Sequence, residues 1–266
     1  MRMLIQDILK ERTRSRRMWV IWPILALVII GSAWGLADPR AQVTDGLSID
    51  DGFDVMYVSS VFILLSATLG CVLNSFDGIA RDRISGVLEI HLSQPISRSS
   101  LARANLFGHW AAICIPTLIL VFLSILIIRY RMGEWVEFGD ILVHLIATAL
   151  VLYWYTVIQL IASSFSRDMG SAVAVGIGVW MTFTLLWLLV TALAGGLIGI
   201  ETTDDSWISF EALIDLFSPN GVYHHLLETR LDTSRGIHES LIWISALIWT
   251  IVPTWILMKR YNSITP

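Results

Sequence analysis

Six long stretches of the chain are almost wholly apolar, and polar segments separate them. They cover residues 19–37, 55–76, 106–128, 141–165, 171–200 and 239–258. A helix needs about 20 mostly apolar residues to cross the hydrocarbon core of a membrane. The pattern therefore predicts an all-α membrane protein with six transmembrane helices in a single domain, residues 1–266. The fifth and longest stretch is long enough to tilt or bend. Bending and close helix contact are permitted by its glycines, Gly176, Gly178, Gly195, Gly196 and Gly199.

The composition excludes an ordinary soluble domain. Hydrophobic residues make up 55% of the chain and charged residues 15%, whereas soluble domains carry roughly 25% charged residues. The only two cysteines, Cys71 and Cys114, lie inside apolar stretches. We therefore expect them to be buried and unpaired, rather than part of a disulfide framework or a zinc site.

The charges on the two sides of the predicted bundle differ in sign. Thirteen Lys and Arg residues fall in 1–18, 77–105, 166–169 and the tail after 258, against five in the segments on the other side. Six acidic residues lie on the first side and sixteen on the second. Because basic residues accumulate on the cytoplasmic side, we expect a multi-pass protein of the cell membrane with both termini in the cytoplasm.

The first segment, residues 1–18, is predicted to be an interfacial helix. Leu4, Ile5, Ile8 and Leu9 share one helical face, and the other positions are mostly charged. Such a helix can lie along the inner surface of the membrane in contact with lipid. A basic anchor that only fixes the topology is an equally good interpretation.

The loop 77–105 is too long for a simple turn between spans. Its apolar residues recur at helical spacing, at Ile84, Val87, Leu88 and Leu92, which predicts one amphipathic helix. The loop's Pro95 ends this helix, and Ser97 or Ser99 caps the next one. The apolar face must be covered by lipid, by neighbouring helices or by a soluble partner.

The loop 201–238 on the opposite side is also long. Phe210, Leu213, Ile214 and Phe217 have helical spacing, and Ser218-Pro219 has the pattern of an N-cap followed by proline at the first helical position. A second short helix is predicted through Val222, Tyr223, Leu226 and Leu227. The two form a short outer helical hairpin before span six, which we expect to dip into the outer leaflet.

Candidate chemistry is sparse, and we predict no catalytic residue and no metal site. His224 and His225 are adjacent, so on a helix they point in different directions and do not share a metal. We expect His109, near the cytoplasmic edge of its span, to face water. Gln159 lies inside a span, where polar groups are functional candidates.

Two energy sources receive little support from the sequence. No acidic residue lies deep in a span, which disfavours a transporter coupled to protons or sodium. A phosphate-binding loop needs lysine directly after glycine, and neither lysine of the chain, Lys10 or Lys259, follows one. Any ATP-driven function must therefore use an ATPase on another chain.

The loop 77–105 resembles the cytoplasmic signature of ABC-2 type permeases. The matching residues are Arg81-Asp82-Arg83-Ile84-Ser85-Gly86-Val87-Leu88-Glu89, followed by Leu92-Ser93-Gln94-Pro95-Ile96-Ser97-Arg98. Leu216-Phe217-Ser218-Pro219 is similar to a further element of that family. The sequence departs from the family pattern at Val87, where threonine is common, and near Asn105, where lysine is often found.

This resemblance implies a permease subunit, mainly of exporters, that dimerises as a homodimer or heterodimer. Each subunit would bind a separate ABC ATPase, which holds the ATP and Mg, so this chain has no cofactor of its own and no ATPase activity. The loop would contain the coupling helix. Its residues would be Arg81, Asp82, Arg83, Ile84, Gly86, Val87, Leu88, Glu89, Leu92, Pro95, Ser97 and Arg98.

Individual roles follow from the same resemblance. The apolar residues would fill a groove of the ATPase or pack on the bundle, and the charged ones would select the partner. Gly86 would allow a close approach of backbones, and Pro95 would fix the exit from the helix.

Two further hypotheses stay open beside the permease. The chain could transmit ATPase-driven motion to an extracytoplasmic protein without moving a solute, with acidic outer loops as the docking surface, at Asp50, Asp51, Asp54, Asp204 and Asp205. An intramembrane enzyme is disfavoured, because no nucleophile–base pair is apparent. A nucleic-acid partner is not expected.

Overall fold

The computed structural model describes residues 2–38, 49–200, 202–203, 206–231 and 236–264. These residues form helices and loops, without a strand. The helices are α1 (Arg2–Thr13), α2 (Met18–Leu36), α3 (Gly52–Ser75), α4 (Ala80–Ile84), α5 (Val87–Ser93), α6 (Arg98–Met132), α7 (Phe138–Phe165), α8 (Met169–Thr184), α9 (Trp187–Ile198), α10 (Trp207–Asp215), α11 (Pro219–Glu228) and α12 (Glu239–Ser263).

The predicted all-α membrane fold is confirmed. Among the described residues, α2, α3, α6, α7 and α12 are each long and apolar enough to cross a membrane. The pair α8 and α9 passes the same test together, with a bend of 61° between them, and provides the sixth crossing if it is one broken span. The third span is longer than predicted, because α6 begins at Arg98 and continues to Met132.

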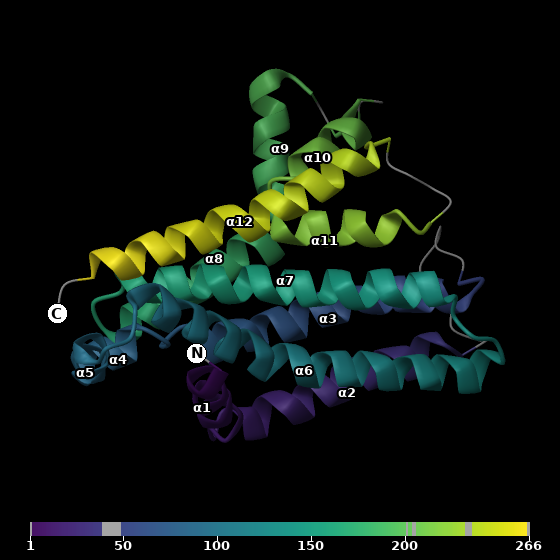
Figure 1. Cartoon of the computed structure of the whole chain (residues 1–266). Coiled ribbons are helices and arrows are strands. Elements are labelled where there is room, and N and C mark those ends of the chain that lie inside the picture. The colour runs from purple at the N-terminus through teal and green to yellow at the C-terminus, as the bar shows by residue number, and fades with distance from the viewer. Residues whose placement is uncertain (1, 39–48, 201, 204–205, 232–235, 265–266) are drawn as a thin grey trace.

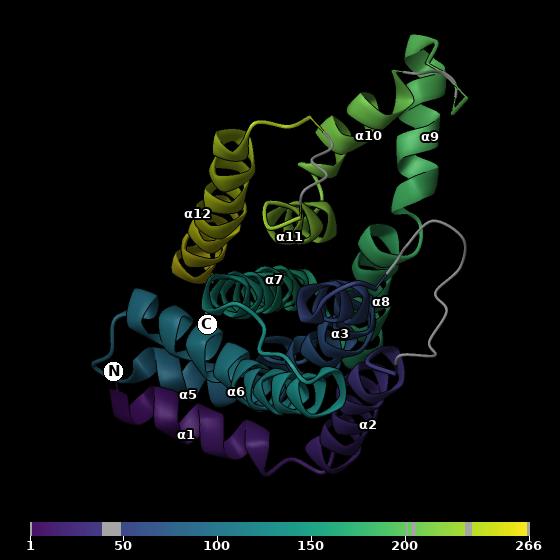
Figure 2. The ribbon, with the colours of Figure 1, turned by 90° about the vertical axis from the view of Figure 1, so that its right-hand side faces the viewer.

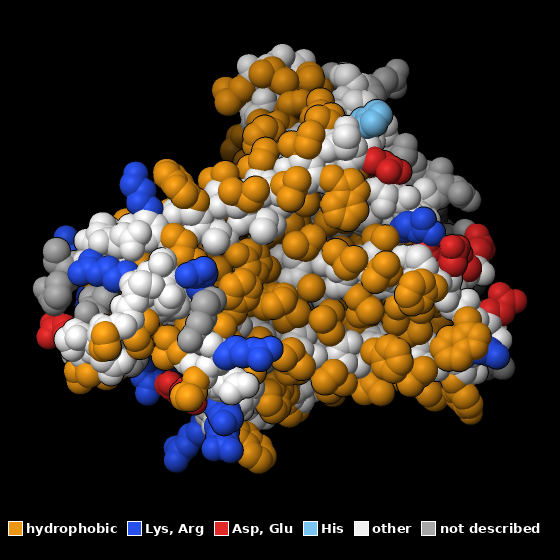
Figure 3. All heavy atoms as spheres, in the orientation of Figure 1, with side chains coloured by type: hydrophobic (Ala, Val, Ile, Leu, Met, Phe, Trp, Pro, Cys, Tyr) orange, Lys and Arg blue, Asp and Glu red, His pale blue; other side chains and the backbone are white. Residues whose placement is uncertain are grey.

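The two ends of the bundle differ in charge. The segments α1, α4, α5 and the last turn of α12 gather at one end, where both ends of the chain also lie (Figure 1). Most Lys and Arg side chains on the visible face lie at this end and most Asp and Glu side chains at the other, with apolar side chains covering the flanks between them (Figure 3). We call them the basic end and the acidic end.

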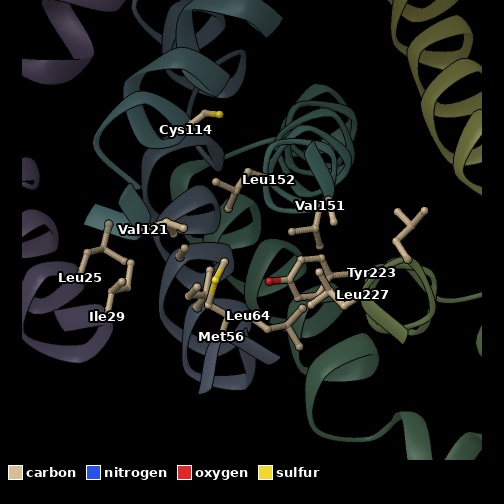
Figure 4. Close-up of a cluster of buried hydrophobic side chains, with 14 of the residues drawn as sticks. Leu25, Ile29, Met56, Leu64, Cys114, Val121, Val151, Leu152, Tyr223 and Leu227 are labelled. Carbon is tan, nitrogen blue, oxygen red and sulfur yellow. The ribbon is translucent and has the colours of Figure 1, made fainter. Parts of the chain in front are cut away.

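The core lies between the long helices, with α3 and α7 at its centre (Figure 2). Buried side chains of α2, α3, α6, α7 and α11 interdigitate there (Figure 4). The buried residues Cys71 and Cys114 are both free thiols, as predicted. In a lipid environment close packing, rather than a hydrophobic force between helices, holds such a bundle together.

The segment between the fifth and sixth crossings contains both predicted short helices, α10 and α11. Ser218 caps α11, accepting hydrogen bonds from the backbone N–H of Asn220 and Gly221, and Pro219 takes the first helical position. The helix α11 packs beside α7 and α12, and most of its residues are buried. By contrast α9 and α10 project sideways from the bundle (Figures 1 and 2).

The first helix forms as predicted, and it packs against α6. It crosses α6 at the basic end (Figure 2), and it lies close to α6 at Gly108, where a Cβ atom would lie 2.5 Å from Cγ2 of Ile8. The predicted apolar face, Leu4, Ile5, Ile8 and Leu9, is only half-buried. Contact of this helix with the membrane surface stays a prediction.

Candidate functional site: the α4–α5 segment

The segment between α3 and α6 contains two short helices instead of the one predicted helix. The break lies at Ser85-Gly86, where Gly86 has a φ of +73°. Only glycine adopts this left-handed conformation without strain. A Cβ atom built at Gly86 meets nothing within 4 Å in this chain, so the expected close approach of another backbone stays a prediction. The role of Gly86 within the chain is the turn between α4 and α5.

The root of the segment is attached to the end of α7. The backbone N–H groups of Ile79 and Ala80 both donate to Oγ of Ser163, at 3.1 and 3.0 Å. One turn later, Arg83 donates to the backbone oxygens of Ser164, at 2.9 Å, and Ser166, at 3.3 Å. Arg83 is therefore held by hydrogen bonds inside the chain, and its contact with a partner stays a prediction.

The residue before the root, Asp77, joins the segment to the first helix. Its carboxylate is fully buried and accepts from Arg12, with Nη1 3.0 Å from Oδ1, and from Arg17, with Nη2 2.8 Å from Oδ2. Asp77 is 65 residues from Arg12 and 60 from Arg17 in the sequence, and sequence reasoning did not connect it with them.

The helix α5 presents opposite faces to the bundle and to solvent. Leu88 is 3% exposed and packs in a small apolar cluster with Leu101 of α6 and Leu160 of α7. Ile90 is 59% exposed, and Ile84 on α4 is 55% exposed. The predicted continuous stripe is therefore divided, because the turn at Gly86 rotates α5 relative to α4.

The exposed side of the segment combines apolar and charged groups. Ile84, Ile90 and Ile96 are exposed there, as are Arg81 and Glu89. Val87, Asp82 and Gly86 are half-buried. Leu92 belongs to α5, and its side chain lies outside the described residues. Exposed isoleucines flanked by charges can dock on a protein partner.

The exit from the segment confirms two predictions. The helix α5 ends at Ser93, two residues before Pro95, and Ser97 is the N-cap of α6, with its Oγ accepting from the N–H of Ser100. Arg98 then donates to the backbone oxygens of Asn262, at 2.8 Å, and Ile264, at 2.7 Å. This side chain fixes the last turn of α12 to the start of α6.

Two polar residues of the spans are held inside the bundle. His109 is fully buried, and its Nδ1 lies 2.7 Å from the backbone oxygen of Asn105, so the expectation that it faces water is wrong. Gln159 is also fully buried and donates to the backbone oxygen of Gly176, at 3.1 Å.

A groove of about 600 Å³ opens near the acidic end, between α10 and α12. Leu213 and Phe217 line one wall, and Leu241, Ile244 and Ile248 line the other. The hydroxyl of Ser245, also at the wall, donates to the backbone oxygen of Leu216 at 2.6 Å. The groove is therefore suited to apolar groups.

The acidic outer residues have structural roles where they are described. Asp51 and Asp54 form the capping box of α3, and Asp50 donates its N–H to Asp54. Asp204 and Asp205 lie outside the described residues. In the described part of the chain, no group of three or more potential ligands could hold a metal ion.

A comparison with protein families matches almost the whole chain. The model of a family described as "ABC-2 family transporter protein" matches residues 4–263. This range contains all the helices from α2 to α12 and so the whole α4–α5 segment. No curated protein matches the chain at a significant level.

Proposed function

The chain belongs to the ABC-2 transporter family, and from this membership we propose that it is the permease subunit of an ATP-binding-cassette exporter. The ATPase is a separate chain that binds ATP and Mg. A second permease subunit completes the transporter. The basic end, with both termini, faces the cytoplasm.

The main observation in support of this proposal is the structure of the α4–α5 segment. It combines a buried attachment to the bundle, through Ser163 and Leu88, with exposed isoleucines at the tip, Ile84 and Ile90. A segment that only joined two spans would need neither feature. The exposed side fits a groove of a cytoplasmic ATPase. The attached side transmits a movement of the ATPase to α7.

Two features of the chain support the orientation and the second subunit. The excess of basic residues at the end that contains α4 and α5 agrees with a cytoplasmic location. The projecting helix α9 exposes Leu188, Leu193 and Leu197, and apolar area of this kind on one side of a bundle suits contact with a second permease or with lipid.

Site-specific photocrosslinking tests the proposal. A photoreactive amino acid at position 84 or 90 should crosslink the permease to an ABC ATPase in native membranes. The matched control is Trp135, which is 63% exposed but lies at the acidic end, on the loop between α6 and α7. Crosslinks to a protein without ATPase motifs from both test positions would reject the proposal.

A further inference from the structure

Asp77 is the point at which four parts of the chain meet. Its two carboxylate oxygens are divided between two guanidinium groups, one from Arg12 in α1 and the other from Arg17, just before α2. Asp77 itself lies between the end of α3 and the start of α4. The side chain is fully buried, and Arg12 is 7% exposed.

The second arginine is held from several sides. Besides Asp77, Arg17 donates from Nη1 to the backbone oxygen of Leu73, at 3.2 Å. Its guanidinium also lies over the ring of Phe76, 4.7 Å from the centroid. The junction between α1 and α2 is thus fixed to the last turn of α3.

The chain immediately after Asp77 has little room to move. A Cβ atom on Gly78 would lie 2.7 Å from Cδ2 of Leu160 and 2.8 Å from Nε2 of His109. The next two residues donate their N–H groups to Ser163. A displacement of α4 therefore acts directly on Asp77, because no flexible linker lies between them.

A buried carboxylate holds its partners strongly. Separating one guanidinium from Asp77 without solvation would leave a charge poorly compensated in a low-dielectric environment, which is costly. The pairs are therefore expected to stay intact when the segment moves, and the arginines to follow the carboxylate. The helix α1 also touches α6 at Gly108. It therefore contacts the chain on both sides of the α4–α5 segment, before it at Asp77 and after it at Gly108.

We propose that Asp77 is a positioning residue for energy coupling, which makes α1 and the root of the α4–α5 segment move as one body. The inference rests on the proposed function, since it assumes that an ATPase acts on this segment. It adds a role for the first helix, which transmits the motion instead of serving as a stationary membrane anchor.

Hydrogen–deuterium exchange on the complex of permease and ATPase tests this role. Exchange is compared between the nucleotide-free and the vanadate-trapped state, in peptides from α1 and from residues 77–84. In the wild type, both regions should change their protection together. In Asp77→Asn, which keeps the shape of the side chain and removes its charge, the 77–84 peptides should still respond and the α1 peptides should lose most of their response.

The matched control is Asp140→Asn. Asp140 is mostly buried and accepts from Nε of Arg230 at 2.6 Å, but this ion pair lies at the acidic end. The control should behave like the wild type in both regions. If Asp77→Asn does not insert, Arg12→Gln tests the same link, because it removes only the α1 partner and leaves Arg17 on the carboxylate.

The outcomes separate the inference from the proposed function. If the wild-type complex responds in 77–84 but not in α1, or if the α1 response survives in both Asp77→Asn and Arg12→Gln, the positioning role is refuted while the permease assignment stands. If no ATPase co-purifies with the wild type, or if residues 77–84 never respond, both are refuted. Equal ATPase recovery with Asp77→Asn and wild type shows that the variant affects transmission and not binding.

Discussion

Tyr155 on α7 donates a hydrogen bond of 2.7 Å to Oδ1 of Asn220, in the first turn of α11. The same amide donates from Nδ2 to the backbone oxygen of Phe183, at 2.9 Å, in the last turn of α8. The α8–α9 bend is thus bound by side chains from two other helices. Irregular backbone inside a membrane bundle needs polar partners of this kind.

Removing this amide should loosen the bend. Asn220→Ala leaves Tyr155 and the Phe183 carbonyl without this partner, so we expect the free energy of unfolding to fall by about 1–3 kcal/mol. Thermal unfolding in detergent measures the change as a lower midpoint. The control is Thr182→Ala, an exposed residue whose hydroxyl bonds only within α8. Equal midpoints for the two variants would contradict this account of the bend.

Substitutions on the two faces of α5 should have different effects, one on stability and the other on partner binding. Leu88→Ala opens a cavity in the small cluster at the basic end, which should cost about 2–5 kcal/mol of stability. Ile90→Ala removes an exposed side chain and should leave the thermal midpoint unchanged while it weakens capture of the ATPase. Thermal unfolding and quantitative pull-down on the same samples measure both effects. If Ile90→Ala lowers the thermal midpoint and Leu88→Ala instead weakens only the capture of the ATPase, this assignment of the two faces is wrong.

The position of α1 should depend on the absence of a side chain at residue 108. In Gly108→Ala the new methyl group would overlap with Ile8, so α1 must shift away from α6. We expect trypsin to cleave after Lys10 and Arg12 several times faster than in the wild type. Gly31→Ala in α2 is the control, because a Cβ atom there meets nothing within 4 Å. Equal cleavage rates in all three proteins would show that this contact does not hold α1.

Labelling from the two sides of the membrane tests the orientation. Ser85, between α4 and α5, and Glu134, between α6 and α7, are both exposed. The α4–α5 turn and the α6–α7 loop lie at opposite ends of the bundle (Figure 1). In intact cells a membrane-impermeant maleimide should label Glu134→Cys and not Ser85→Cys, and inverted vesicles should reverse this pattern. The native thiols are buried and should contribute little background. Labelling of Ser85→Cys in intact cells would reverse the proposed topology.

The sequence was most informative where local rules determine the structure. The apolar stretches marked the spans, and the Ser218-Pro219 pair marked the start of α11, because both depend on neighbouring residues. The residues that attach the α4–α5 segment to the bundle could not be predicted in this way. Ser163 and Asp77 act through partners on other helices, and no local pattern distinguishes them from other serines and aspartates.

The prediction of a single helix in the loop 77–105 failed for a physical reason. The spacing of Ile84, Val87 and Leu88 is the same in one long helix and in two helices joined by a turn, so periodicity did not reveal the break at Gly86. The bend expected in the fifth span is present, and it lies at Leu185–Leu186, between the glycines. The amide of Asn220, 34 residues further along the chain from Leu186, supports that bend.

The central claim is that an ABC ATPase binds the exposed side of the α4–α5 segment. Gentle purification of the tagged chain from its native membrane, with mass spectrometry of the bound proteins, tests it most directly. We predict an ABC ATPase in about equal molar amount with the wild type and with Trp135→Asp, and its loss from the Ile84→Asp, Ile90→Asp double variant at normal permease levels. The absence of any ATPase from the wild type, even after crosslinking from positions 84 and 90, would contradict the account.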